Sequence, residues 1–241
     1  MRFTFILLFS FTCYSAISQQ FEKDVINTNK GPLTITFIGH GSLMMEFNNL
    51  VIHIDPSSKE ADYSGLPDAD LVLITHHHGD HCDAVAVEHL RKQGTATILT
   101  ALAKEKLGLG EIINNNETKD FKFIKIEAIP AYNLIHKRDN GELFHTQGCC
   151  NSYILNIADK RIFIGGDTEN TPEIKALTNI DIAFLPMNLP YTMTPEMVAD
   201  AAKAFRPQIL YPYHYGKTDT SIILELLKDE KDIEVRIRKM L

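Results

Sequence analysis

The sequence predicts an α+β fold in which two β-rich layers are flanked by helices. Short apolar runs end repeatedly in turn residues, as strands do, and the first three runs cover residues 33–38, 50–54 and 71–74. The helical segments fall late in each half of the chain, which disfavours a doubly wound parallel sheet. No short-period repeat or interdomain linker is present, so residues 19–241 are expected to form one domain.

The remaining elements follow from periodicity and capping residues. A helix is expected at residues 83–91, where apolar residues recur at helical spacing between an acidic start and a basic end. A second helix should begin at Thr194-Pro195-Glu196, because proline suits the first helical position. A third helix is expected at residues 221–228, and further strands at 97–100, 121–128, 153–157, 161–164, 182–185 and 233–237. Asp139-Asn140-Gly141 marks a hairpin tip in an otherwise open loop.

The first eighteen residues have the pattern of a signal peptide. Arg2 precedes an uncharged run over residues 3–11, and the small residues Ser15, Ala16 and Ser18 follow. The apolar run is short for a membrane span, which needs about 20 residues. We therefore expect cleavage near Ser18, a periplasmic or secreted protein and no stable membrane anchoring after cleavage. A single anchoring span is the alternative.

The charge of the chain disfavours nucleic acid as a partner. Without residues 1–18 the sequence has 23 basic against 31 acidic residues, a formal charge of −8. Such a chain repels phosphate backbones. A small-molecule substrate is expected instead, and an anionic one would have to be attracted by bound metal or by a local basic patch.

The cysteines predict no disulfide framework. Cys13 leaves with the signal, and Cys82, Cys149 and Cys150 remain, which is an odd number. Isolated thiols are expected, since a disulfide between adjacent cysteines would be strained. Cys82 follows the histidine cluster and could contact a metal, but a buried thiol without a role in the site is the expectation.

The stretch "ITHHHGDH" (residues 74–81) gathers imidazoles and a carboxylate directly behind an apolar run. Side chains of extended chain alternate sides, so His76 and His78 can aim at one point while His77 points away. Asp80 and His81 follow where the chain turns toward the helix, and they can serve a second point nearby. Imidazole nitrogen and carboxylate oxygen are zinc ligands, so the pattern suits two metal ions. A solvated polar loop is the alternative for any one of these histidines.

Two later stretches offer the further ligands that a dinuclear site needs. "FIGGDT" places Asp167 after a strand and two glycines, where the backbone can turn sharply and one carboxylate can bridge two cations. "ILYPYHYG" places His214 after another strand. Taken singly, Asp167 is typical of a turn and His214 of a buried core histidine. With the first cluster they form a candidate ligand set.

These motifs together resemble the metallo-β-lactamase superfamily, whose HxHxDH motif stands here as His76, His78, Asp80 and His81. More narrowly the chain is similar to the lactonase-like and N-acyl-phosphatidylethanolamine phospholipase D-like branch of metal-dependent hydrolases. The resemblance covers nearly all of residues 31–241. The supporting motifs are "IGHGS" (38–42), "IHIDP" (52–56), "PAYN" (130–133), "GGDT" (165–168), "YTMTPEMVADAA" (191–202) and "YPYHYG" (211–216).

The resemblance implies an αββα sandwich of two similar β-rich halves, with the metal ions at one edge between the sheets. It implies that Asp167 bridges the ions and that His76 and His78 hold the first. Asp80, His81 and His214 are implied to hold the second. Two cations lower the pKa of a shared water towards about 7, so a bridging hydroxide becomes available to attack a carbonyl or phosphorus. Asp80 or Asp167 can orient this group or accept its proton.

Several residues are expected around the ligands. Asp55 is a candidate acceptor for the free N–H of a ligand imidazole, with an Asp-Pro turn as the alternative. By resemblance, His40, Ser42 and Tyr191 are expected to line the site. Two other histidines are expected to be structural: His53 in a strand and His89 on a helix.

The chain departs from the family pattern at Asn133, where relatives often carry a third histidine for the first metal. An amide oxygen is a weaker zinc donor than imidazole, so a nearby histidine should be preferred. His136 precedes two cations near the hairpin tip, whereas His145 lies on the returning side of the loop. His145 is therefore the expected ligand, with Asn133 or a water as the alternative.

Two other positions narrow the chemistry by comparison with the superfamily. Asp167 occupies the place where one subclass of classical β-lactamases carries cysteine, which disfavours antibiotic hydrolysis. His78 stands where flavodiiron-type relatives carry glutamate, which disfavours redox iron chemistry.

The expected function is that of an exported dinuclear zinc-dependent hydrolase acting on an ester, lactone or phosphodiester. Two Zn²⁺ ions per chain are expected, with Mn²⁺ or Fe²⁺ as alternatives. The alternative function is that of a non-catalytic periplasmic metal-binding protein. Asp80 and Asp167 favour the enzyme, because a storage site has no need of an open, bridged water position.

Overall fold

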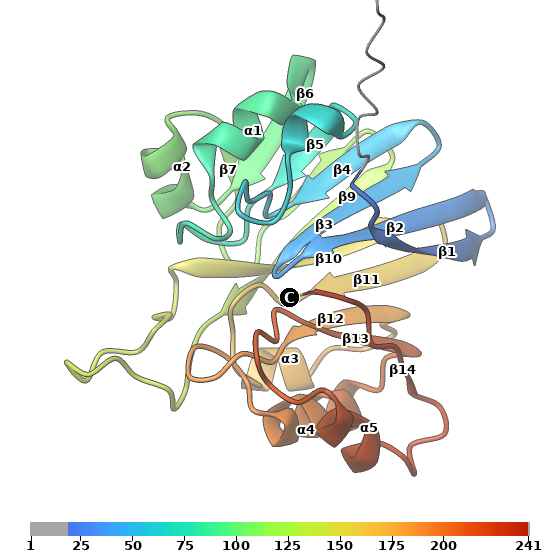
Figure 1. Cartoon of the computed structure of the whole chain (residues 1–241), viewed down its shortest axis with the longest axis vertical. Coiled ribbons are helices and arrows are strands. Elements are labelled where there is room, and N and C mark those ends of the chain that lie inside the picture. Colours follow the sequence, from blue (N-terminus) through green and yellow to red (C-terminus); the bar gives the residue numbers. More distant parts are fainter. Residues whose placement is uncertain (1–18, 241) are drawn as a thin grey trace, which may run out of the picture.

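The computed structural model describes residues 19–240, which form two β-sheets packed face to face with helices on the outer faces (Figure 1). The fold is the predicted αββα sandwich. The segment expected to be a signal peptide lies outside the described residues. Within residues 19–240, no helix is long and apolar enough to cross a membrane.

The first sheet contains seven strands that are neighbours in chain order, an antiparallel ribbon followed by parallel strands. The ribbon consists of β1 (Glu22–Thr28), β2 (Gly31–Gly39), β3 (Ser42–Phe47) and β4 (Leu50–Ile54). The parallel part adds β5 (Ala69–Leu73), β6 (Arg91–Leu99) and β7 (Glu111–Ile112) beside β4.

The second sheet repeats this plan, again with seven strands. Its antiparallel part consists of β8 (Thr118–Phe121), β9 (Ile124–Ala131), β10 (Cys150–Ile157) and β11 (Lys160–Ile164). Its parallel part adds β12 (Ile182–Pro186), β13 (Ile209–Tyr213) and β14 (Glu234–Val235). The shared order of antiparallel and then parallel strands makes the two halves similar, as expected.

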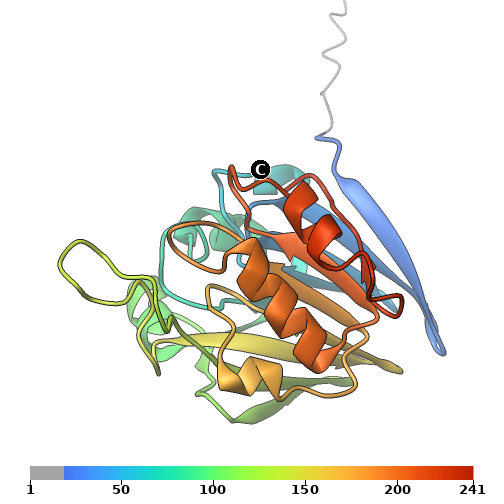
Figure 2. The ribbon, with the colours of Figure 1, turned by 90° about the horizontal axis from the view of Figure 1, so that it is seen from below.

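The helices cover the outer faces of the two sheets (Figures 1 and 2). On the first sheet lie α1 (Ala84–Leu90) and α2 (Ala101–Leu107), and on the second lie α3 (Pro172–Lys175), α4 (Pro195–Phe205) and α5 (Ser221–Leu226). A short 3-10 helix at Tyr63–Gly65 precedes β5. Thr194 caps α4 by accepting from the backbone N–H of Met197, and Pro195 is its first residue. That helix therefore begins where the sequence predicted it.

The main core lies between the two sheets. Strand side chains alternate between faces, so each sheet turns one apolar face inward. Aromatic rings from both sheets meet there: the Phe37 centroid lies 6.3 Å from that of Phe184 and 5.1 Å from that of Tyr211. A smaller cluster that includes Val72 and Leu90 lies between the first sheet and its helices. Burial of each large apolar side chain contributes about 1.5–3 kcal/mol.

The structure contains elements that periodicity did not reveal. Strand β1 was missed because its residues are mostly polar and one face is exposed. The segment expected as one strand at 121–128 contains the end of β8, a turn at Lys122 with φ 52°, and the first part of β9. Helix α2 was missed although Thr100 caps its start and Gly108, with φ 71°, ends it.

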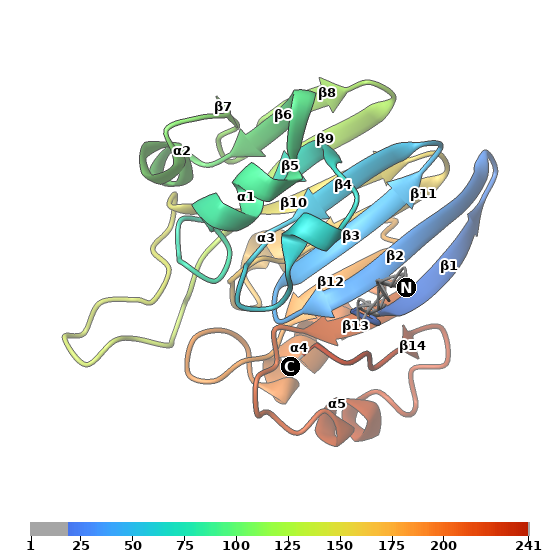
Figure 3. The same cartoon turned by 45° about the horizontal axis from the view of Figure 1, so that its top comes forward.

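The loops that follow strands of both sheets meet at one edge of the sandwich, which Figure 3 shows tilted by 45° from the view of Figure 1. Residues that follow the carboxyl ends of parallel neighbours share one edge. Asp55 follows β4 and His76 lies three residues beyond β5, and in the second sheet Asp167 follows β11 and His214 follows β13. The fold thus gathers these side chains from both halves.

Candidate metal centre

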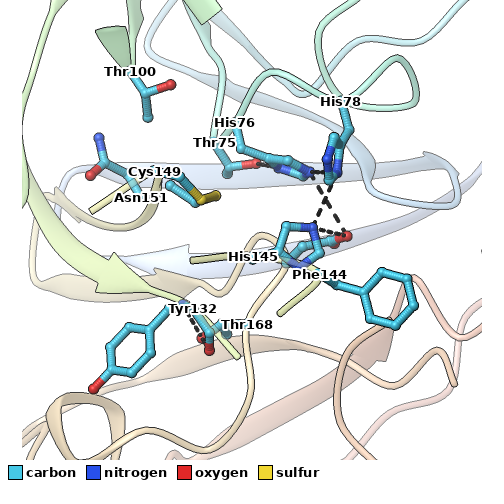
Figure 4. The surroundings of a disulfide bond; sticks show 12 residues. Thr75, His76, His78, Thr100, Tyr132, Phe144, His145, Cys149, Asn151 and Thr168 are labelled. Atoms are coloured by element: carbon cyan, nitrogen blue, oxygen red, sulfur yellow. Dashed lines mark hydrogen bonds and ion pairs between the residues drawn. A yellow bond between two sulfur atoms is a disulfide. The ribbon is translucent and has the colours of Figure 1, made fainter. Parts of the chain in front are cut away.

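Four side chains converge in a first group: His76, His78, His145 and Asp167. One ligand atom from each lies within 4.8 Å of the others. His78 Nδ1 lies 3.1 Å from both His76 Nε2 and His145 Nε2, and His145 Nε2 lies 3.3 Å from Asp167 Oδ2. Figure 4 shows the His145 ring directed toward His76 and His78. The structure thus places His145, rather than Asn133 or His136, in this group.

A second group consists of His40, Asp80, His81 and His214. Asp80 Oδ2 lies 3.3 Å from His40 Nε2, 3.9 Å from His214 Nε2 and 4.0 Å from His81 Nε2. The rings of His40 and His214 have centroids 3.8 Å apart. His40, which was expected only to line the site, is therefore placed as a ligand candidate.

The carboxylate of Asp167 faces both groups. Its Oδ2 is turned to the first group, 3.9 Å from His76 Nε2, and its Oδ1 lies 3.3 Å from both His81 Nε2 and His214 Nε2. Gly166 before it has φ 59°, and a Cβ there would lie 2.8 Å from Cβ of Thr75. Glycine is thus required here both by the backbone conformation and by the close contact with Thr75. It allows the turn that places Asp167 between the two groups.

Three residues at the site adopt left-handed backbone conformations that are rare outside glycine: His40 (φ 49°), Asp55 (φ 45°) and His214 (φ 48°). The backbone N–H of His214 donates to the carbonyl of His40 at 2.9 Å, which joins the two strand ends across the sheets. Strain of this kind costs of order 1–3 kcal/mol per residue and is typical of functional sites.

Asp55 supports the second group from behind. Its Oδ2 lies 2.8 Å from His81 Nδ1, so the other ring nitrogen of His81 is turned to the site. Thr75 donates to the same carboxylate through its backbone N–H at 2.7 Å and its hydroxyl at 2.6 Å. Asp55 thus occupies the predicted supporting position, and Thr75 is a supporting residue that sequence reasoning missed.

Burial and neighbouring charges set the protonation of the cluster. Burial lowers the pKa of His76 well below its ordinary value and that of His214 to about 4, so both imidazoles are neutral at pH 7. Burial raises the pKa of Asp167, but its electrostatic interactions with the imidazoles of His214 and His81 outweigh burial and hold it well below its ordinary value. Burial lowers the pKa of His81, but Asp167 and Asp55 raise it well above its ordinary value, so a divalent cation would have to displace the proton of His81 before that imidazole could join the donor set.

A buried glutamate holds the loop that carries His145. The carboxylate of Glu169 is fully buried and accepts from the backbone N–H groups of Leu134, Ile135 and His136 at 2.7–2.8 Å. It also accepts from Asn133 Nδ2 at 2.9 Å and pairs with His136 Nδ1 at 2.7 Å. Sequence reasoning missed Glu169. Because His136 pairs with Glu169, its imidazole belongs to neither group of ligand candidates.

A family model described as "Beta-lactamase superfamily domain" matches residues 34–214, which include all members of both groups. This match covers well over half of the chain. The chain belongs to this family. The prediction of the metallo-β-lactamase superfamily is thereby confirmed, whereas the narrower lactonase-like branch stays a prediction.

Similar proteins agree with the superfamily assignment. A solved structure of a putative metal-dependent hydrolase from Parabacteroides distasonis is 47% identical, covers 92% of this chain and 100% of its own, and has a TM-score of 0.88. A UPF0173 metal-dependent hydrolase of Methanopyrus kandleri is 28% identical over 76% of this chain and 84% of its own length. A metallo hydrolase of Ignicoccus hospitalis shares the fold at 22% identity, with 86% and 95% coverage and a TM-score of 0.71.

A cleft of about 400 Å³ opens over the metal groups of this superfamily member. Besides ligand candidates it is lined by Gly79, Arg138, Phe144, Asn188 and Tyr191. Tyr191 was expected here and is 45% exposed. Ser42 was expected to line the site but does not, because its hydroxyl is buried and donates to the carbonyl of Asp55 at 2.6 Å.

The expectation of isolated thiols is wrong for one pair of cysteines. Cys149 and Cys150 form a disulfide, beside the site in Figure 4. The chain turns just before them, where the backbone N–H of Cys149 donates to the carbonyl of Thr146 at 3.1 Å. This turn sets the two side chains at the start of β10. Cys82 is buried and free, with its Sγ 3.9 Å from the carbonyl oxygen of Ala103, outside both metal groups.

The two histidines expected to be structural lie away from both groups. His53 is fully buried in β4, and its Nε2 lies 3.0 Å from the carbonyl oxygen of Pro67. His89 lies in α1 with an exposed side chain. Neither faces the cleft.

Proposed function

We propose that the chain is a hydrolase that uses two divalent metal ions, with zinc in both sites, to cleave an ester, a lactone or a phosphodiester. The enzyme class agrees with the relatives, which are named metal-dependent hydrolases. The observation that carries the proposal is the position of Asp167, whose two oxygens face two separate groups of ligand candidates.

Unpaired polar atoms in the centre support a metal pair. Asp167 Oδ1, His81 Nε2 and His214 Nε2 are buried and have no hydrogen-bond partner among residues 19–240. A buried polar atom without a partner costs about 1–3 kcal/mol. Such atoms converging at one point fit cations that accept their lone pairs.

The two groups of candidate ligands indicate which residues would hold each ion. His76, His78 and His145 would hold the first ion, His40, Asp80, His81 and His214 the second, and Asp167 would bridge. Imidazole and carboxylate together suit zinc, with Mn²⁺ or Fe²⁺ as alternatives. When bound, two such cations lower the pKa of a coordinated water and stabilise negative charge on the attacked group.

Asp80 is the candidate for proton transfer during hydrolysis. Burial raises the pKa of Asp80, but a hydrogen bond from His40 and the charges of His81 and His214 hold it below its ordinary value. Asp80 is therefore a carboxylate at neutral pH, with 35% of its side chain exposed toward the cleft. It can accept a proton from the attacking water and return it to the leaving group.

The alternative is a protein that binds metal without turnover. Its test is a titration of the purified protein with zinc while a panel of lactone, ester, phosphodiester and β-lactam substrates is assayed. Turnover that rises with bound zinc supports the hydrolase. Stoichiometric zinc binding without turnover of any substrate class supports the binding protein.

Export is part of the proposal. The pattern of residues 1–18 supports a cleaved secretory signal, so the mature chain would begin near Gln19 in the periplasm or medium. N-terminal sequencing of protein from each cell fraction tests this. A chain that retains Met1 in the membrane fraction contradicts cleavage.

A further inference from the structure

A cationic side chain reaches the cleft from the loop between β9 and β10. Figure 1 shows this loop extending away from the sandwich. Arg138 lies on it and lines the cleft beside His78, Phe144 and Tyr191. Its Nη2 donates to the carbonyl of Phe144 at 3.1 Å, and its guanidinium lies 5.0 Å from the centre of the Phe144 ring. These contacts direct the guanidinium while most of its five N–H groups remain to bind something else.

Arg138 and His78 meet at the edge of the cleft. Its Nη2 lies 3.4 Å from His78 Nε2, whereas His78 Nδ1 is turned to the first metal group. A neutral imidazole has one N–H, and with a metal ion held at Nδ1 that hydrogen would lie on Nε2. The guanidinium is always protonated. In the metal-loaded protein two N–H donors would therefore converge at the edge of the cleft, where one acceptor can bridge them.

A second cation, Lys106, lies near these donors although the whole chain has a formal charge of −7. The Nζ atom of Lys106 donates to the carbonyl of His77 at 2.9 Å and lies 3.9 Å from where a Cβ on Gly79 would be. Gly79 itself lines the cleft. A local cationic corner of this kind attracts an anion that the net charge would repel.

We infer that Arg138 and the Nε2–H of His78 bind a negatively charged carboxylate or phosphate group of the substrate, separate from the bond that is cleaved. The inference rests on the proposed function, because it places the reacting bond at the metal groups. An Arg fork and an imidazole N–H match the oxygens of either anion. Phe144 and Tyr191, with ring centroids 5.0 Å apart, form an aromatic wall beside this anion site for an apolar part of the same substrate.

Calorimetric titration of the zinc-loaded protein tests the anion site without turnover. Butyrate offers one carboxylate, which the metals can bind, whereas succinate adds a second carboxylate and 3-phosphonopropionate adds a phosphonate. Wild type should bind one or both dianions about tenfold more tightly than butyrate or better, as a charge-assisted hydrogen bond allows. The preferred dianion identifies the group that the site accepts.

Arg138→Gln should abolish this preference. Lys137→Gln is the matched control, because Lys137 is an exposed neighbour on the same loop and its loss changes the net charge equally. The control should keep the wild-type preference. A wild type without preference for either dianion overturns the inference, and so does an Arg138→Gln variant that keeps it.

Paired esters separate this inference from the proposed function. Mono-4-nitrophenyl succinate carries a free carboxylate, and 4-nitrophenyl butyrate carries none. Arg138→Gln should raise the KM of the anionic ester about tenfold and leave the neutral ester unchanged. Equal losses on both esters overturn the anion site. If the zinc-loaded wild type cleaves neither these esters nor any substrate of the panel, hydrolysis is contradicted, while the calorimetric preference still decides the anion site.

Discussion

The side-chain oxygen of Asn133 lies 2.8 Å from His145 Nδ1 and 2.9 Å from the backbone nitrogen of the same histidine. One amide oxygen therefore fixes both the ring and the backbone of His145. With the hydrogen on Nδ1, the lone pair of Nε2 points at Asp167 and His78. Asn133 itself is behind the ligand candidate and outside the cleft lining.

Asn133→Ala should weaken zinc binding at the first group about 10- to 100-fold, the usual effect of removing a residue that orients a ligand. Competition with a chromogenic zinc chelator measures the affinity. Asn140→Ala at the exposed hairpin tip is the control and should bind zinc as wild type does. Unchanged affinity in Asn133→Ala would mean that His145 needs no support.

His145→Ala should reduce zinc affinity, whereas His136→Ala should leave it unchanged. His145 is 2% exposed with Nε2 in the first group, while His136 pairs with Glu169 and belongs to neither group. The same competition measures both variants. Equal losses in the two variants would show that the loop as a whole, and not an imidazole at position 145, matters for the metal.

Asp167→Asn should reduce turnover roughly 100-fold or more, as expected when a central charged group is lost, and should change stability little. The amide keeps the shape of the side chain but removes the charge that lies between the two groups. The measurements are kcat and the midpoint of urea unfolding of the metal-free protein. Wild-type turnover and metal content in Asp167→Asn would show that Asp167 is only a turn residue.

The motifs revealed most of the centre because the ligand candidates other than His145 come soon after strands, and most of those strands have an apolar run that is visible in the sequence. Glu169 could not be found this way. Its role depends on accepting from Asn133 and the backbone of residues 134–136, more than thirty positions earlier. Thr75 was hidden for the same reason, since only the folded chain brings it to Asp55.

Secondary structure was predictable where apolar periodicity was strong, as for β4 and α4, and failed where the elements are short or polar. Strand β1 pairs along its full length with β2, but its mostly exposed side chains leave no periodic apolar signal. The disulfide of Cys149 and Cys150 depends on a local turn that composition does not specify. Strand pairing decided the first of these features and a local backbone turn the second.

The stability of the metal-free protein should decrease as the pH falls from about 6.5 to 4, partly because of His53. Burial lowers the pKa of His53 to about 4 in the folded protein. In that interval the unfolded chain binds a proton that the folded chain does not, so acid favours unfolding. The contribution is on the order of 3 kcal/mol at the acid end of the range.

His53→Gln keeps a donor for the Pro67 carbonyl but cannot be protonated. Urea unfolding of the metal-free wild type and variant at several pH values isolates the contribution of His53 to the pH dependence of stability, because all other histidines are common to both proteins. The stability of the variant should fall less steeply with acid. Parallel curves of stability against pH for the two proteins would mean that the pKa of His53 does not change on unfolding.

The number of zinc ions that each chain retains is the most direct test of a metal pair shared by Asp167. After loading and dialysis, mass spectrometry of the metal content should give about two ions for wild type. His214→Ala should retain about one, because His76, His78 and His145 still hold the first ion. One ion in wild type, or two in His214→Ala, would contradict the two-metal centre.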